Sequence, residues 1–207
     1  MARAAPYDRE AALESALALF WDKGYHATSL KDLEKTLRMK PGSIYAAFSS
    51  KENLYLLALE RYFNASRARL RDVMETAESP LSALADYLRS FARLAQGDRA
   101  RQACMLTKTL VDTRSTEPAI ATAAQEYLTE IQHEFAAAFR AAQSCGELSQ
   151  ALDANRLARR FQANVMALRL ALHQGMEAAA FEELAEDMAR EIEDMRQAEV
   201  PCRSDQF

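Results

Sequence analysis

A short stretch near the N-terminus combines cationic, hydroxyl and very small side chains at a spacing suited to a DNA groove. Residues 40–48 read KPGSIYAAF, where Ile44 and Phe48 lie four apart and predict the buried face of one short helix. Pro41 presets φ and suits a first helical turn. The opposite face then holds Lys40, Pro41, Gly42, Ser43, Tyr45 and Ala46. A cation, hydroxyl groups and small residues that permit close approach predict a helix that reads a major groove.

Two further helices must position this face. Leu30, Leu33 and Leu37 repeat at i, i+3 and i+7, which predicts a helix just before it, joined by a tight turn. Residues 9–24 carry another apolar stripe, and Gly24 suits the end of that helix. Thr28 and Ser29 suit a helix start, and Ser29 has an acid three residues on, close to a capping box. We read Ser49 and Glu52 as repeating that device before the next helix. The pattern predicts a three-helix, helix-turn-helix DNA-binding head.

The run TS-(7)-LRMKPGSIYAAFSSKENLY resembles the tetracycline-repressor (TetR) family of bacterial transcription regulators. The resemblance covers about residues 8–62, and G-S-I-Y-x-x-F-x-S-K-E is its most specific part. It implies an all-α protein of about nine helices with two domains. We expect a helix-turn-helix DNA-binding domain over 1–52, a helical effector-binding and dimerisation domain over 53–200, and a C-terminal tail over 201–207.

The resemblance also assigns DNA contacts, to a double-stranded operator. Thr28 would hold a backbone phosphate, residues 40–43 would enter the major groove, and Tyr45 and Lys51 would reach phosphates. The turn departs from the family pattern, because Arg38 stands where glycine is usual. If φ is positive there, Arg38 costs about 1 kcal/mol, but it offers a further phosphate contact. The full expected set is Thr28, Ser29, Arg38, Lys40, Pro41, Gly42, Ser43, Tyr45 and Lys51.

Composition favours long helices and a modest attraction to DNA. The chain has 207 residues, 49% of them apolar, with only five glycines and five prolines. Its net charge is −4, but residues 1–52 hold eight Lys and Arg against seven Asp and Glu, which gives +1, and the rest holds eighteen against twenty-three, which gives −5. Binding would therefore depend on a few placed cations and on two heads per molecule.

The last two predicted helices, which begin after Asp153 and at about residue 179, each carry an apolar stripe. Because a single helix-turn-helix needs a second copy to read two half-sites, we expect a homodimer built from these stripes. In the alternative, both stripes only cover their own core. The expected interface residues are Leu157, Phe161, Leu168, Leu172, Leu184, Met188 and Ile192.

TetR-like bodies usually hold a small-molecule effector, and its binding tilts the helix that leaves the head, here 51–74, and changes the spacing of the two heads. The expected lining is Tyr62, Phe63, Tyr87, Phe91, Cys104, Met105, Thr109, Tyr127 and Gln162. These side chains predict a mainly apolar or aromatic effector. Aromatic residues at helical spacing are equally ordinary core. On this interpretation the protein is a repressor that the effector releases from DNA.

Cys104 offers an alternative trigger. It follows Arg99 and Arg101, and Lys108 lies one helical turn further on, so nearby cations favour the thiolate. The segment ACMLTKTLVD resembles one TetR branch in which, in some members, this cysteine senses oxidants or electrophiles. A small buried hydrophobe is the other interpretation of a free cysteine.

The residue patterns typical of metal-binding proteins, enzymes and membrane proteins are not found in the sequence. Three cysteines without C-x-x-C spacing and three scattered histidines predict neither a metal site nor any other cofactor. No glycine-rich phosphate loop or nucleophile elbow points to an enzyme. No apolar run approaches the ~18 residues of a membrane span, so we expect a cytoplasmic protein without membrane contact. A helical scaffold protein that does not bind DNA is the remaining alternative.

Overall fold

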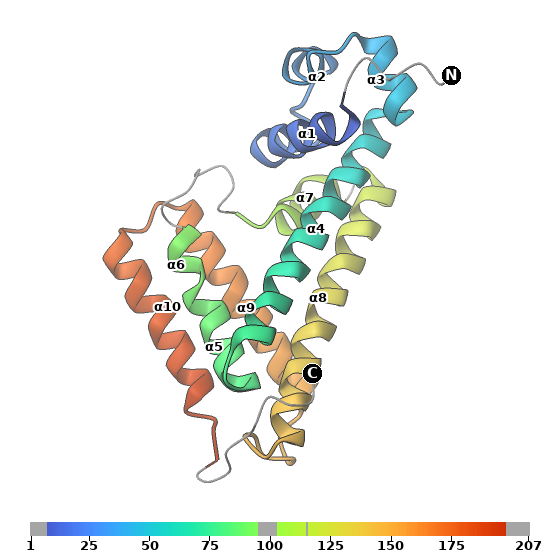
Figure 1. The fold of residues 1–207 in the computed structure, drawn as a ribbon. Coiled ribbons are helices and arrows are strands. Elements are labelled where there is room, and N and C mark those ends of the chain that lie inside the picture. The colour runs from blue at the N-terminus through green and yellow to red at the C-terminus, as the bar shows by residue number, and fades with distance from the viewer. Residues whose placement is uncertain (1–7, 95–102, 115, 198–207) are drawn as a thin grey trace. The chain divides into compact units, whose positions relative to one another are not determined.

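The computed structural model describes residues 8–94, 103–114 and 116–197, and those residues form helices without any strand (Figure 1). The expectation of an all-α fold is confirmed. The chain divides into two compact units. The first extends to Ala65 and includes Met105–Tyr127, and the second includes Ser66–Cys104 and the chain from Leu128 onward.

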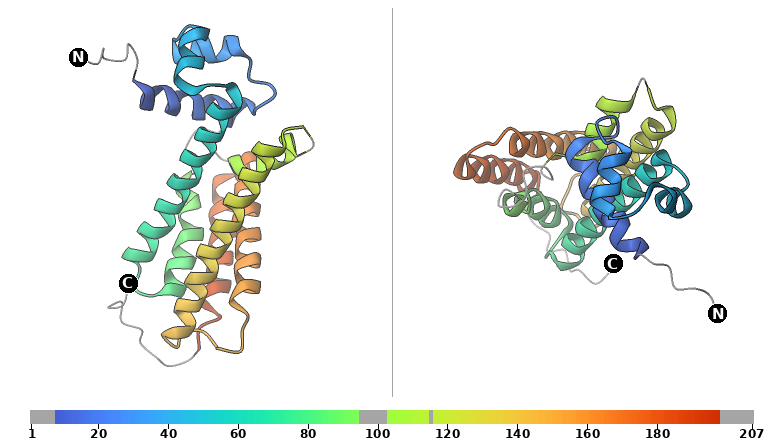
Figure 2. Two further views of the ribbon diagram at one scale, coloured as in Figure 1. Left: turned by 90° about the vertical axis from the view of Figure 1, so that its right-hand side faces the viewer. Right: turned by 90° about the horizontal axis from the view of Figure 1, so that it is seen from above.

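The first unit begins with the three predicted short helices, α1 (Arg9–Lys23), α2 (Leu30–Leu37) and α3 (Pro41–Phe48), which group together in both views of Figure 2. Gly24 ends α1 with φ +81°, as predicted. Ser29 and Asp32 form a complete capping box at the start of α2. Local sequence therefore sets the ends of these helices, and their buried apolar faces hold them together.

The junction between α3 and α4 (Lys51–Thr76) differs from the prediction. Ser49 does not cap α4, because it ends α3 with φ +65° and its N–H donates to the carbonyl of Tyr45. Ser50 takes the capping role, and its Oγ accepts from the N–H of Asn53 at 2.9 Å. The two serines are adjacent and chemically identical. Only their backbone geometry determines that Ser49 ends α3 and that Ser50 caps α4.

Helix α7 (Met105–Thr113) belongs to the same unit as the head. The Tyr55 hydroxyl of α4 and the Thr109 hydroxyl of α7 are hydrogen-bonded at 2.8 Å in a buried position. The Lys108 ammonium donates to the carbonyls of Trp21 and Asp22, at 2.7 and 3.1 Å, at the end of α1. The sequence analysis did not anticipate this direct attachment of α7 to the head.

The second unit is a bundle of the remaining helices around an aromatic core. It contains α5 (Pro80–Arg89), α6 (Phe91–Leu94), α9 (Ala154–His173) and α10 (Ala178–Glu193), with the later parts of α4 and of α8 (Pro118–Ser144). Ser79 and Asp153 cap α5 and α9 as predicted. The helical chain divides at Ser90, between α5 and α6.

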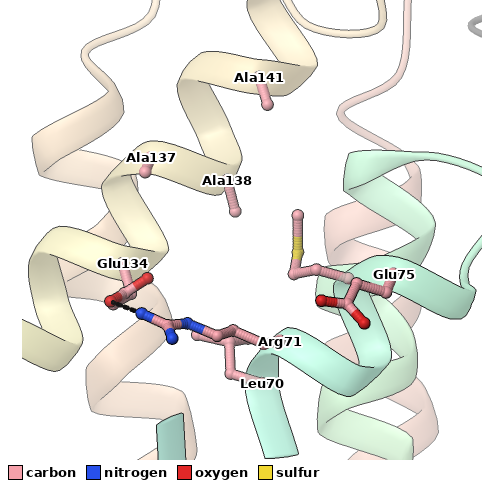
Figure 3. A pocket seen from close by; sticks show the side chains of 8 residues that line it. Leu70, Arg71, Glu75, Glu134, Ala137, Ala138 and Ala141 are labelled. Carbon is pink, nitrogen blue, oxygen red and sulfur yellow. Dashed lines mark hydrogen bonds and ion pairs between the residues drawn. The ribbon is translucent and has the colours of Figure 1, made fainter. Parts of the chain in front are cut away.

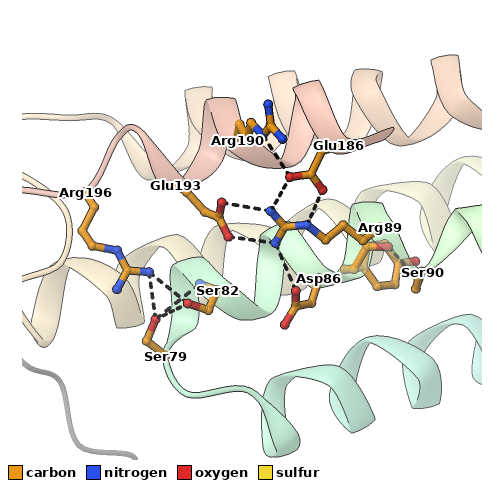
Figure 4. Close-up of polar contacts among 10 residues, drawn as sticks. Ser79, Ser82, Asp86, Arg89, Ser90, Glu186, Arg190, Glu193 and Arg196 are labelled. Carbon is orange, nitrogen blue, oxygen red and sulfur yellow. Dashed lines mark hydrogen bonds and ion pairs between the residues drawn. The ribbon is translucent and has the colours of Figure 1, made fainter. Parts of the chain in front are cut away.

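An ionic cluster attaches α10 to α5 (Figure 4). The Arg89 guanidinium donates to Glu186 at 2.7 Å and to Glu193 at 2.8 Å, and it also contacts Asp86 at 3.2 Å. These bonds hold the pKa of the Glu186 carboxyl at about 2 and lower that of Glu193. Both carboxylates thus bind Arg89 only while they are ionised.

A second ion pair lies just beyond the C-terminal end of α10. The Glu147 carboxylate is almost fully buried, pairs with Arg196 at 2.8 Å, and accepts the N–H of Leu81 in the first turn of α5 at 3.1 Å. The N–H of Gln197 donates to the Glu147 carbonyl at 2.9 Å. One buried acid therefore joins the start of α5 to the segment that follows α10.

We predict that Arg89→Met flattens the acid dependence of stability. A carboxyl whose folded pKa is depressed stabilises the fold above its unfolded pKa, and this stabilisation is lost as the pH falls through the folded pKa. For Glu186 that window extends from the ordinary 4.5 down to about 2. Urea unfolding at pH 7, 5, 4 and 3 should show a stability difference between wild type and variant that shrinks toward acid. Arg160→Met, at an exposed position of α9, is the matched control, and an equal pH dependence in all three proteins would contradict the assignment.

Candidate DNA-binding and effector-binding sites

The exposed face of α3 has the composition that the sequence predicts. Ile44 and Phe48 are each 1% exposed and point into the head. Lys40, Gly42 and Tyr45 are exposed, and Pro41 and Ser43 are half-buried beside them. The burial of Ile44 and Phe48 therefore turns the Lys40 ammonium, the Tyr45 phenol and the small Gly42 toward solvent. A helix that enters a DNA major groove needs such an exposed face.

Gly42 has no role in the protein's own packing. A Cβ built at this position meets nothing within 4 Å, and its φ lies outside the left-handed region. Glycine inside a helix is less stable than alanine by about 1 kcal/mol. The packing of the protein itself therefore gives no reason for a glycine at this position.

Arg38 adopts the conformation that the family's glycine would take. Its φ and ψ are 52° and 37°, in the left-handed region, and it ends α2. The side chain is exposed, two residues before Lys40. The backbone strain is about 1 kcal/mol, and two exposed cations beside the start of α3 favour a phosphate.

Two expected phosphate contacts are placed differently. Thr28 is fully buried and its hydroxyl donates to the carbonyl of Gly24 at 2.7 Å, so the hydroxyl is engaged within the head and the phosphate contact of Thr28 stays a prediction. The Lys51 ammonium lies 4.3 Å from the centroid of the Tyr25 ring, and partial burial lowers the pKa of Lys51. Lys51 therefore packs inside the head unit. Ser29 is exposed, although its hydroxyl is engaged in the capping box.

The nine residues expected to line an effector pocket divide between the two units. In the first unit, Phe63 stacks on Tyr127 with ring centroids 4.5 Å apart. In the second, Tyr87 packs edge-on against Phe91 at 5.4 Å, and the Gln162 amide donates to the carbonyl of Leu128. Cys104 is half-exposed just before α7. Tyr62, Met105 and Thr109 are buried in the first unit. A common pocket for all nine stays a prediction.

Comparison with known proteins decides the family. Residues 12–58 match the family "Bacterial regulatory proteins, tetR family", and residues 80–188 match "Tetracyclin repressor-like, C-terminal domain". The chain belongs to the TetR family. TetR proteins are DNA-binding transcriptional regulators, and the resemblance stated from the sequence is confirmed.

Similar TetR proteins include repressors and a DNA complex. The "HTH-type transcriptional repressor ComR" of Escherichia coli is 41% identical over 42% of this chain, and the match spans only 41% of ComR. The uncharacterized regulator YezE of Bacillus subtilis is 24% identical over 72% of this chain and 77% of its own. A cysteine mutant of the regulator CifR, solved with a 26-bp operator, has a TM-score of 0.84 and 26% identity over 91% of this chain and 98% of its own.

A surface groove in the second unit is lined by none of the residues expected to line an effector pocket (Figure 3). It has a volume of about 250 Å³, and its walls are Leu70, Arg71, Met74 and Glu75 of α4 and Glu134, Ala137, Ala138 and Ala141 of α8. Arg67 and Arg71 both donate to Glu134, at 3.0 and 3.5 Å. This volume is below the ~300–1,000 Å³ usual for small-molecule sites, so we do not assign the TetR effector to it.

The expected dimer contacts differ in how much surface they expose. Five of the seven residues belong to the core of their own unit and have almost no exposed surface: Leu157, Phe161, Leu168, Leu172 and Ile192. These five side chains already pack in the core of their own unit and offer little surface to a second copy, so their place in an interface stays a prediction. Leu184 and Met188 are half-buried and keep more surface for such a contact. The periodicity located the inner face of each helix correctly.

Two other site classes find no support in the described part of the chain. No group of three or more His, Cys, Asp or Glu side chains there could hold a metal ion. Within the same residues, every helix is too short or too polar to traverse a lipid bilayer.

We predict that Gly42→Ala stabilises the head and weakens operator binding. The new methyl group has open space in the protein, so the free energy of unfolding should rise by about 0.5–1 kcal/mol. The same methyl would meet the DNA, and specific affinity should fall about tenfold, as a loss of 1–2 kcal/mol implies. Thermal unfolding and fluorescence anisotropy on the same sample measure both. Unchanged affinity in the stabilised variant would show that Gly42 does not face DNA.

Proposed function

We propose that this TetR protein is a homodimeric repressor that reads an operator with two α3 helices. A small, mainly apolar or aromatic effector releases it. The observation that carries the proposal is the exposed face of α3, with Lys40, Gly42 and Tyr45 outward over a buried Ile44. The operator complex of CifR, at 26% identity, supports the same use of the head.

The second copy docks, in this proposal, on the exposed side of α9. Ala163, Ala167 and Leu170 follow one another at i, i+4 and i+7 and are exposed, and Leu170 has 55% of its surface open. Leu184 and Met188 of α10 add half-buried apolar surface. A stripe of alanine and leucine lets two helices approach closely, as a four-helix dimer interface requires.

The effector signal would reach the head through α7 as well as α4. Thr109 and Lys108 bind α4 and the end of α1 within the first unit. A displacement of α7 would therefore break a buried hydrogen bond and remove the cation from the α1 carbonyls. An effector shifts the equilibrium only by its preference for the released state, typically about 1–3 kcal/mol.

Gel shifts on the DNA upstream of the protein's own gene test this function. Wild type should give a specific band that a shuffled duplex does not give. Lys40→Ala should reduce specific affinity about tenfold or more and relax base preference, because its cation is placed at the major groove. Lys35→Ala, on the exposed side of α2, is the matched control and should change both duplexes slightly and equally.

Sedimentation of the same wild-type protein and of a Leu170→Glu variant tests the proposed dimer. Leu170→Glu places a charge on the α9 stripe and should yield folded monomers in sedimentation runs, without a specific band. A wild type that is monomeric at micromolar concentration and shows no specific band would refute the proposed function. Equal losses on both duplexes for Lys40→Ala would refute the groove assignment alone.

A second trigger is thiol oxidation at Cys104. Its side chain is half-exposed and lies directly before α7. A hydroperoxide would oxidise the thiolate to sulfenic acid and be reduced to water or an alcohol.

Cys104→Ser separates this trigger from effector binding. We expect peroxide to release wild-type protein from its operator and to leave the variant bound, because serine forms no sulfenic acid. Cys145→Ser is the matched control, since Cys145 is also half-exposed. Equal release of wild type and Cys104→Ser would end the thiol interpretation and leave the effector interpretation intact.

A further inference from the structure

One side of α2 carries a row of exposed cations that leads to the start of α3. Lys31 and Lys35 are exposed four residues apart on α2, and Arg38 follows three residues later as its exposed C-terminal cap. Residues spaced i, i+4 and i+7 lie on one side of a helix. Lys40 follows two residues after Arg38 and is the N-cap of α3. We call Lys31, Lys35 and Arg38 the α2 row.

Other side chains of α2 are used within the head. Leu33 and Leu37 are buried in its core. The Asp32 carboxylate accepts from the Lys23 ammonium at 2.7 Å and forms the capping box with Ser29. The hydrogen bond from Lys23 lowers the pKa of Asp32, so this carboxylate stays ionised and neutralises its partner. Packing and capping thus account for these residues, whereas the α2 row is turned to solvent.

The net charge of the head understates the charge of the α2 row. Residues 1–52 sum to +1, but their acids are unevenly placed. Glu10 and Glu14 of α1 accept from the Arg61 guanidinium of α4 at 2.6 and 2.8 Å. Glu34 is half-buried within one helical turn of the α2 row, and it reduces the local charge of that row from three cations to a net +2. A row of exposed cations on one side of a small unit attracts a polyanion.

The position of the α2 row suits the backbone of the DNA more than its bases. In the proposed function α3 occupies the major groove, and the helix before a recognition helix crosses the phosphate backbone. Lys31 and Lys35 are about 6 Å apart along the helix axis. Their long side chains can therefore bind neighbouring phosphates of one strand, and phosphate contacts carry no base sequence.

We propose that Lys31 and Lys35, together with Arg38, bind the phosphate backbone beside the groove that α3 enters. The α2 row supplies affinity that does not depend on base sequence, and the exposed face of α3 supplies the choice of bases. This deepens the proposed function and rests on DNA binding by the head. The small and equal change on both duplexes expected for Lys35→Ala in the gel shifts is the behaviour of such a contact.

The salt dependence of DNA binding by the full-length protein tests the α2 row. Fluorescence anisotropy measures affinity for the upstream fragment and for a shuffled duplex at about 50, 100 and 200 mM NaCl. Each neutralised phosphate contributes about 0.9 to the slope of log affinity against log salt. Lys31→Gln and Lys35→Gln each remove one contact from both heads of a dimer. Each should lower the slope by about 2 on both duplexes and leave the ratio of the two affinities unchanged.

Three further variants separate a local contact from a change of net charge. Arg93→Gln removes an exposed cation of α6 and should keep the wild-type slope. Lys31→Arg retains the charge on the α2 row and should also keep that slope. Glu34→Gln removes the acid next to the row and should raise the affinity for both duplexes, because less negative charge then faces the phosphates.

Each outcome decides the proposal. Unchanged slopes in Lys31→Gln and Lys35→Gln, or equal changes in these variants and in Arg93→Gln, would overturn it. A loss confined to the upstream fragment would also overturn it, because it would indicate base contacts, and so would a Glu34→Gln variant that binds no better than wild type. A wild type that binds both duplexes equally would refute the proposed operator function, while the slopes would still decide the α2 row. Circular dichroism of every variant verifies that its helices are intact.

Discussion

The DNA-facing surface depends on the burial of two side chains of α3. A helix of eight residues is too short to be stable in water by itself, so tertiary packing must hold it. Ile44 and Phe48 supply that packing, and the Arg9 guanidinium lies 5.2 Å from the Phe48 ring. Because these two residues fix the rotation of the helix, they also fix which side chains face outward. The functional face is thus set by the apolar residues behind it.

The grouping of α7 with the head gives a physical route for regulation. A helix that shares a buried hydroxyl pair with α4 and donates to the end of α1 cannot shift without disturbing both. Buried hydrogen bonds of this kind have few alternative geometries, since an unpaired hydroxyl in the core is costly. Such an arrangement favours two discrete states over a gradual deformation.

Local signals in the sequence predicted most of the head and of the helix boundaries. Gly24, the Ser29 capping box, Pro41 and Asp153 act within one or two turns of chain, so their effect is readable from spacing alone. The family resemblance supplied the positive φ expected at Arg38. The roles of the two serines at 49 and 50 depended on backbone angles, which no side-chain pattern specifies.

Long-range partners were the part that the sequence could not supply. Periodicity identified the apolar faces of α9 and α10, but it cannot tell a face that packs on its own unit from one that meets another chain. Thr28 looked available for a phosphate until its hydroxyl was found bonded to Gly24. The sequence pattern does not single out Arg169, and only the fold buries it beside the Phe91 ring.

The buried Glu147 sets a limit on how far the C-terminal end can be shortened. Arg196 forms an ion pair with its carboxylate, and the N–H of Gln197 donates to its carbonyl. These two residues therefore connect the end of α10 to the start of α5. Removal of the chain from Arg196 onward would leave an acid without its counter-ion in a place that water does not reach. Helix α10 therefore relies on residues beyond its own last turn.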